Sequence, residues 1–201
     1  MVKLEYFYLL VLLLTTHQSI ITAANPATMN YINASCRNTR YPALCVRCLS
    51  RYASSIQGND LELAKAAISV TLNNAKSTAD YVSKLAGSSG LKPSAYQTLK
   101  DCNNNMNNCV QSLSQSVQEL AKMGQFRGQN FEWHMSNVET WVSSALTNQN
   151  TCSRGFSDGS MDGPVKEGVT RRMNYLAPLT SNALALINRF ALRHKPRTHT
   201  P

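Results

Sequence analysis

The side chains of this 201-residue chain that are most able to take part in chemistry are six cysteines and one centrally placed histidine. Cys45 and Cys48 have the C-x-x-C spacing of redox sites, but a thioredoxin-like site needs a strand-to-helix setting that the sequence lacks. A zinc site formed by Cys45, Cys48, Cys102 and Cys109 is the alternative. The spacing of the second pair, and the secretory N-terminus described below, argue against zinc.

His134 is the only histidine in the predicted helical body, because the others lie in the first 24 residues or beyond residue 193. Nucleophilic catalysis needs a base fixed beside a serine or cysteine. An isolated histidine between an aromatic residue and a methionine is more typical of a packed helix. No metalloprotease, phosphate-loop or paired-carboxylate motif stands out. We therefore expect no catalytic residue, no cofactor and no metal.

The N-terminus, Met1–Ala24, has the pattern of a secretory signal peptide. Lys3 supplies the positive start, Tyr6–Leu14 the apolar run, and Thr22–Ala24 the small residues before cleavage. The apolar run is about half of the roughly 20 residues that a membrane span requires. We expect a secreted, extracellular protein that begins near Asn25, has no membrane span, and contains cysteines that form disulfides.

The net charge of +9 is unevenly distributed. Residues 25–59 contain four arginines and no acid, residues 189–201 contain four basic residues and no acid, and residues 60–188 are nearly neutral. Basic ends on a neutral body could contact a polyanion such as a wall polysaccharide, or could simply be solvated. No nucleic-acid-binding module is recognisable. Asn33 begins an Asn-Ala-Ser sequence, so we predict it as a glycosylation site.

The segment Asn137–Cys152 indicates the organising helix, because apolar residues recur there at helical spacing. Trp141 is the largest residue of this stripe, and we expect it deep in the core. The helix is predicted to end in polar residues before Cys152, which is well placed to join it to a neighbouring helix. Cys102 on the preceding helix is the natural partner.

The rest of the chain also has helical periodicity, and no segment alternates convincingly as a strand would. Pro42 is expected to start a short helix in a cysteine-rich opening, Asp60 to cap the first long helix, and Pro178 to kink the last one. The fold class is all-α, an antiparallel up-down-up-down four-helix bundle. The predicted long helices are 60–86, 93 to about 123, roughly 130–148, and 164 to about 191, with a loop at 153–163.

Four sequence motifs resemble the plant invertase and pectin methylesterase inhibitor family, most closely its branch of 21 kDa proteins. Ala34–Cys45 is similar to the opening cysteine pair of the family around a Thr-x-Tyr-Pro core. Tyr96–Cys102 and Val138–Cys152 resemble the segments of the third and fourth cysteines, and Thr180–Leu186 resembles the closing helix. The likeness extends over residues 28–192.

The resemblance implies a disulfide-stapled bundle with a protruding N-terminal helical hairpin. It implies bridges Cys36–Cys45 and Cys102–Cys152, and leaves Cys48 and Cys109 either paired with each other or free; we predict free thiols. The implied domains are the signal peptide 1–24, the hairpin 25–59, the bundle 60–192 and a disordered basic tail 193–201.

The resemblance also implies an inhibitor of the apoplast or cell wall that is not an enzyme. The implied target is pectin methylesterase, whose substrate cleft the inhibitor would occlude without forming a covalent bond. The alternative target is cell-wall or vacuolar invertase. A Pro-Lys-Phe motif of invertase inhibitors is absent here, which favours pectin methylesterase. A third hypothesis is a wall protein that binds de-esterified pectin without inhibiting an enzyme.

We predict a target-binding surface on the outer faces of the first two long helices, whose amides and hydroxyls could hydrogen-bond a polar cleft without first losing a strongly hydrated charge. The predicted residues are Asn73, Asn74, Ser77, Asp80, Lys84, Asn104, Asn108, Gln111, Gln115, Gln118 and Lys122.

Overall fold

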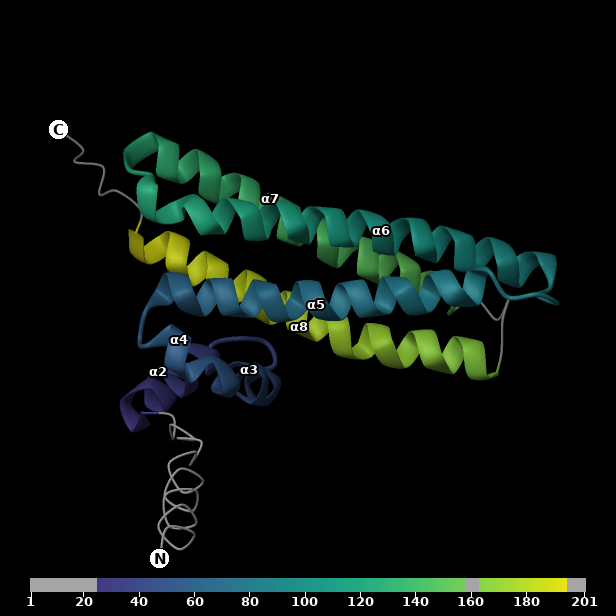
Figure 1. Cartoon of the computed structure of the whole chain (residues 1–201), viewed down its shortest axis with the longest axis horizontal. Coiled ribbons are helices and arrows are strands. Elements are labelled where there is room, and N and C mark those ends of the chain that lie inside the picture. Colours follow the sequence, from purple (N-terminus) through teal and green to yellow (C-terminus); the bar gives the residue numbers. More distant parts are fainter. Residues whose placement is uncertain (1–24, 158–162, 195–201) are drawn as a thin grey trace, which may run out of the picture.

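The computed structural model describes residues 25–157 and 163–194, so the predicted signal peptide and the last seven residues lie outside the described residues. The described part is helical throughout and contains no strand. Its body consists of four long helices, α5 (Asp60–Ala86), α6 (Pro93–Lys122), α7 (Gly128–Gly155) and α8 (Pro164–His194). They form the predicted four-helix bundle, in which each helix packs against its neighbours along its length (Figure 1).

The starts of the long helices follow from local chemistry. The Asn59 side chain accepts hydrogen bonds from the backbone N–H groups of Leu61 and Glu62, at 2.8 and 3.2 Å, and so caps α5. The prediction that Asp60 is the cap was therefore wrong by one residue. Asp60 is the first residue of α5, and its carboxylate is used in tertiary contacts. Pro93 opens α6, where its missing N–H costs no hydrogen bond.

The core stripe of α7 differs from the prediction at its largest residue. Trp141 is only half-buried, whereas Val138, Val142 and Ala145 are completely buried. Buried positions continue at Gln149 and Cys152, so the stripe advances by alternating steps of three and four residues and leaves position 141 at its edge. Cys152 lies inside the helix rather than after it, because α7 continues to Gly155.

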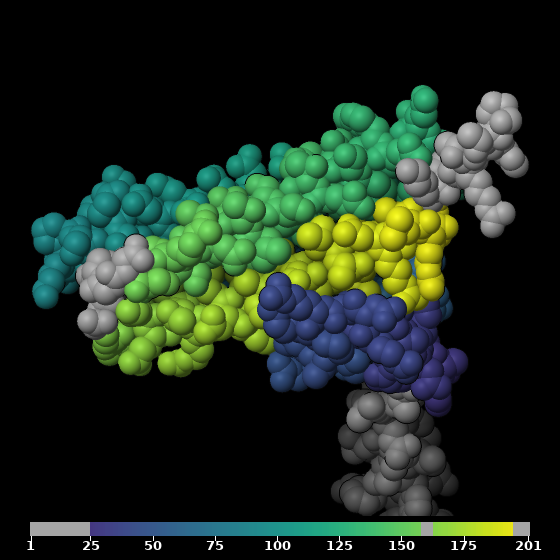
Figure 2. All heavy atoms as spheres, turned by 180° about the vertical axis from the view of Figure 1, so that it is seen from behind, coloured from purple at the N-terminus to yellow at the C-terminus, as the bar shows by residue number. Residues whose placement is uncertain are grey.

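The N-terminal region forms a compact helical hairpin of α2 (Pro26–Cys36) and α3 (Pro42–Leu49), followed by η1 (Ser50–Tyr52) and α4 (Ala53–Ile56). Seen from behind, the hairpin lies against α8 (Figure 2). Ile32 and Ile56 are completely buried in the same apolar cluster as the bundle residues. The hairpin and the bundle therefore share one core.

The last helix, α8, is longer than predicted. It contains Pro178 in its interior and extends to His194, so Arg193 and His194 are helical rather than part of the tail. A second 3-10 segment, η2 (Met123–Gln125), joins α6 to α7. No helix in residues 25–157 and 163–194 is long and apolar enough to cross a membrane.

Candidate functional site

The predicted target-binding residues lie at the surface, but they form two separate stripes. On α5, Asn73, Ser77, Asp80 and Lys84 are exposed and Asn74 is half-buried. The α6 stripe is exposed at every predicted position: Asn104, Asn108, Gln111, Gln115, Gln118 and Lys122. Because each stripe is on the solvent side of its own helix, a partner would have to contact both helices to engage the whole set.

Part of the α5 stripe borders grooves that face away from α6. Asn73 and Asn74 line a groove of about 260 Å³ shared with the hairpin, and Asn74 and Ser77 line one of about 450 Å³ shared with α8. Asn74 and Tyr175 line both grooves, which therefore adjoin. We call the two together the tyrosine–arginine groove, after the side chains that dominate its lining: Arg47, Arg51, Tyr52, Tyr81, Arg171, Arg172 and Tyr175.

Sequence reasoning missed most of this groove. Arg171, Arg172 and Tyr175 were interpreted only as part of the last amphipathic helix, and Tyr81 only as a residue of the first long helix. The dipeptide Arg171–Arg172 was the available signal, since it is the only pair of adjacent like charges in residues 60–188 of the sequence. Only the fold shows that these residues and the hairpin arginines line adjoining grooves beside α5.

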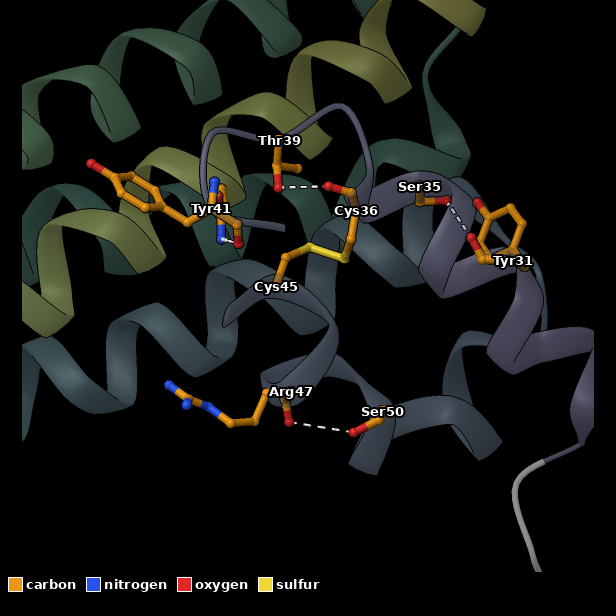
Figure 3. Close-up of a disulfide and its surroundings, with 9 residues drawn as sticks. Tyr31, Ser35, Cys36, Thr39, Tyr41, Cys45, Arg47 and Ser50 are labelled. Atoms are coloured by element: carbon orange, nitrogen blue, oxygen red, sulfur yellow. Dashed lines mark hydrogen bonds between the residues drawn. A yellow bond between two sulfur atoms is a disulfide. The ribbon is translucent and has the colours of Figure 1, made fainter. Parts of the chain in front are cut away.

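The hairpin is held by the Cys36–Cys45 disulfide, whose Cα atoms are 5.6 Å apart (Figure 3). Within the loop that this bridge closes, the Thr39 hydroxyl donates to the Cys36 carbonyl at 2.8 Å. Figure 3 also shows Arg47 extending away from the bridge, with its own carbonyl accepting a hydrogen bond from Ser50. The bridge therefore fixes the loop and leaves the arginine free to project outward.

Asp60, at the start of α5, joins the hairpin helix α2 to the C-terminal end of α8. The Tyr31 hydroxyl of α2 donates to its Oδ1, Arg193 Nη1 lies 3.0 Å from its Oδ2, and Arg189 Nε lies 3.3 Å from Oδ1. Burial alone would raise the pKa of Asp60, but the hydrogen bonds from Tyr31 and Arg193 and the charges of both arginines lower it on balance. The same contact, with burial as the larger cause, raises the pKa of Tyr31 to about 12.

The second disulfide, Cys102–Cys152, ties α6 to α7 as predicted, with Cα atoms 4.4 Å apart. Cys48 and Cys109 are free and buried in the structure. Burial raises the pKa of the Cys109 thiol to about 11, although the Gln149 amide donates to its sulfur at 3.2 Å. Cys109 therefore behaves as a core residue rather than as a nucleophile.

The residues considered for catalysis are placed in structural roles. Cys45 is bridged to Cys36, so the C-x-x-C sequence is not a dithiol pair. His134 contacts Glu119 of α6 and stacks on Phe126 at 3.5 Å, and neither partner is a serine or a cysteine. In the part of the chain that the structure describes, no group of three metal-ligating side chains is close enough to hold a metal ion.

The fold, the two disulfides and the hairpin define the class of protein. The family model for plant invertase/pectin methylesterase inhibitors matches residues 30–186, and the chain belongs to this family.

The chain is similar to particular members of that family over nearly its full length. It is 42% identical to pectinesterase inhibitor 11 of Arabidopsis thaliana over 96% of this chain and 100% of that protein. It is 41% identical to the 21 kDa protein of Daucus carota over 88% of this chain and 92% of that protein.

A solved structure shows the same fold. A mutant form of a pectin methylesterase inhibitor from Arabidopsis superimposes with a TM-score of 0.62 at 20% identity, over 76% of this chain and 92% of that one.

Proposed function

We propose that the chain is a secreted inhibitor of pectin methylesterase that acts by non-covalent, stoichiometric occlusion of the enzyme's substrate cleft. The observation that carries the proposal is the family membership, together with full-length similarity to proteins named as pectinesterase inhibitors. The proposed role is a binding function, and the chain is not proposed to catalyse a reaction.

The geometry is suited to occlusion. A rigid inhibitor loses little conformational entropy on binding, and this bundle is stiffened by the α6–α7 bridge and by the bridged hairpin. The exposed amides of the α6 stripe present many hydrogen-bonding groups and few charges that would have to be desolvated. We therefore propose the α6 stripe, with the exposed part of the α5 stripe, as the enzyme-facing surface.

The test is a titration of purified pectin methylesterase with the protein as secreted from a eukaryotic host. Occlusion predicts loss of activity that is complete at about one inhibitor per enzyme when the enzyme concentration exceeds Kd. It also predicts full recovery of activity after the two proteins are separated. A parallel titration of invertase supplies the alternative target, and inhibition of invertase alone would overturn the proposal.

A further inference from the structure

The tyrosine–arginine groove has the shape of an elongated binding site. The hairpin helix α3 and the N-terminal half of α8 lie on the same side of α5 (Figure 1), and the groove follows that side. Arg47 and Arg51 line the hairpin end, and Arg171 and Arg172 line the end on α8. Together, the two adjoining volumes, about 260 and 450 Å³, fall in the size range of ligand-binding clefts.

One end of the groove is pre-organised around Tyr81. The Arg172 guanidinium carbon lies 4.0 Å from the centre of the Tyr81 ring, a cation–π contact. The hydroxyl of the same ring lies against Gly168, where a Cβ atom would come within 2.0 Å of the tyrosine oxygen. A larger residue at 168 would displace Tyr81 from this position, in which its ring contacts Arg172.

The middle of the groove is organised around Tyr175. Its hydroxyl lies 3.5 Å from the Cys48 sulfur, and its side chain is 39% exposed. The hydrogen bond with Cys48, followed by burial, raises the pKa of Tyr175, while Arg47 and Arg51 act in the opposite direction. Both arginines therefore direct positive charge toward the ring that joins the two halves of the groove.

The positive charge of the groove is uncompensated within the described residues. No Asp or Glu is among the residues that line it. None of its four arginines forms an ion pair with a carboxylate in residues 25–157 and 163–194, whereas Arg189 and Arg193 are paired with Asp60. Four guanidinium groups without carboxylate partners, beside tyrosine rings, favour an anionic ligand with flat apolar faces.

We propose that the tyrosine–arginine groove binds a linear oligouronide, a short chain of sugar rings that carry carboxylates. The choice of uronide rests on the proposed function, because hydrolysis of pectin methyl esters leaves a carboxylate on each sugar. The arginines at both ends pair with carboxylates, and the rings of Tyr81 and Tyr175 contact the C–H faces of the sugars. Asn74 Nδ2 already donates to the Val70 carbonyl at 2.8 Å, which leaves its Oδ1 to accept from a sugar hydroxyl.

The test measures binding of fully de-esterified oligogalacturonides of defined length to the intact mature protein by isothermal titration calorimetry. Arg171→Gln combined with Arg172→Gln, and separately Arg47→Gln combined with Arg51→Gln, should each weaken binding at least about tenfold, because each removes two charge-assisted contacts. The matched control is Arg37→Gln with Arg40→Gln, two exposed arginines of the same hairpin outside the groove, which should change Kd less than about threefold.

Two further ligands make the chemical class testable. The fully methyl-esterified oligomer removes the carboxylates, and oligoglutamate keeps the carboxylates without sugar rings. The proposal expects at least about tenfold weaker binding of either one. Equal binding of oligoglutamate, an equal loss of affinity in the control variant, or absence of oligogalacturonide binding would each overturn it.

Failure of the groove proposal can be distinguished from failure of the proposed function. A protein that inhibits pectin methylesterase but binds no oligouronide overturns the groove proposal alone. A protein that binds oligouronide through the groove arginines and inhibits no pectin methylesterase overturns the proposed function alone. Circular dichroism of each variant establishes that the bundle is folded.

Discussion

The side-chain amide of Asn182 makes both of its hydrogen bonds to the backbone of Tyr41. Its Oδ1 accepts from the Tyr41 N–H at 3.0 Å, and its Nδ2 donates to the Tyr41 carbonyl at 2.9 Å. Asn182 lies in α8 with 3% of its surface exposed, and Tyr41 lies 141 positions earlier in the disulfide-bridged loop. This reciprocal pair is a polar connection between hairpin and bundle, and only an amide supplies both a donor and an acceptor there.

Asn182→Asp should therefore destabilise the protein. The carboxylate can still accept from the Tyr41 N–H, but it repels the Tyr41 carbonyl, which keeps only the hydrogen bond from the Cys45 N–H at 3.0 Å. We expect a loss of about 1–3 kcal/mol in the free energy of unfolding, measured by urea denaturation. The control is Asn174→Asp, an exposed residue of the same helix, and equal stability of the two variants would contradict the role assigned to Asn182.

The Cys102–Cys152 bridge should make a large contribution to stability. The bridge spans 50 residues of sequence, so its loss should cost about 2–5 kcal/mol in Cys102→Ser or Cys152→Ser. Thermal unfolding measures the effect, with Cys48→Ser as a control that removes a thiol without breaking a bridge. An unchanged melting temperature in the bridge variants would refute the expectation.

The two remaining cysteines should be chemically distinguishable. Denaturation without reductant should expose two labelable thiols per chain, by mass spectrometry after alkylation. In the native protein at pH 8, Cys109 should stay unlabelled, because it is completely buried and its pKa of about 11 keeps it protonated. Cys109→Ser should leave one thiol in the denatured protein, and a count of zero in the unmodified protein would demonstrate a third disulfide.

The sequence was sufficient for the helices and bridges because these depend on local periodicity and on cysteine placement. It was insufficient where tertiary packing determines which side chains are buried. Trp141 fits the apolar stripe of an isolated helix, yet the neighbouring helices cover a stripe centred on Val138, Val142 and Ala145. Gln149 was interpreted as part of a polar helix end, but it is completely buried and donates to Thr180 Oγ1 at 2.8 Å. A buried glutamine with such a partner has no distinctive sequence signal.

In the candidate site, too, the sequence predicted what depends on local pattern but not what depends on tertiary contacts. Amphipathicity correctly placed the polar residues of α6 on the solvent side. It could not show that Asn74 borders a groove shared with α8, because α8 follows about 90 residues later in the sequence and its position depends on the whole bundle. Asp60 was interpreted as a helix cap for a similar reason, since its partners Tyr31, Arg189 and Arg193 are all distant in sequence.

Asp60 should make stability sensitive to acid. Its folded pKa is lowered below the ordinary value, so the stability it contributes is present above about pH 4 and is lost as the pH falls through the folded pKa. Asp60→Asn should lower the melting temperature at pH 6, and the difference from the unmodified protein should shrink by pH 3. Glu62→Gln, the neighbouring acid, is the control. A difference that stays constant with pH would show that Asp60 acts through shape rather than charge.

The final prediction tests whether the α6 stripe contacts the enzyme. Asn104→Glu, Gln111→Glu and Gln115→Glu together replace three exposed amides with carboxylates on one face of α6. A carboxylate buried against a polar cleft must lose its hydration, so inhibition of pectin methylesterase should fall at least about tenfold, roughly 1.4 kcal/mol. Helicity and melting temperature should hold, because the three side chains make no core contact.

The matched control applies the same charge change to the outer face of α7. The control variant combines Ser143→Glu, Thr147→Glu and Asn150→Glu, at three exposed positions with similar helical spacing. It should retain inhibition if the effect is local to α6. Equal losses in the two variants would indicate a general effect of negative charge on the encounter, which added salt would screen. Full inhibition by the folded α6 variant would remove the stripe from the interface and direct attention to the hairpin arginines, where Arg47 and Arg51 project beside α5.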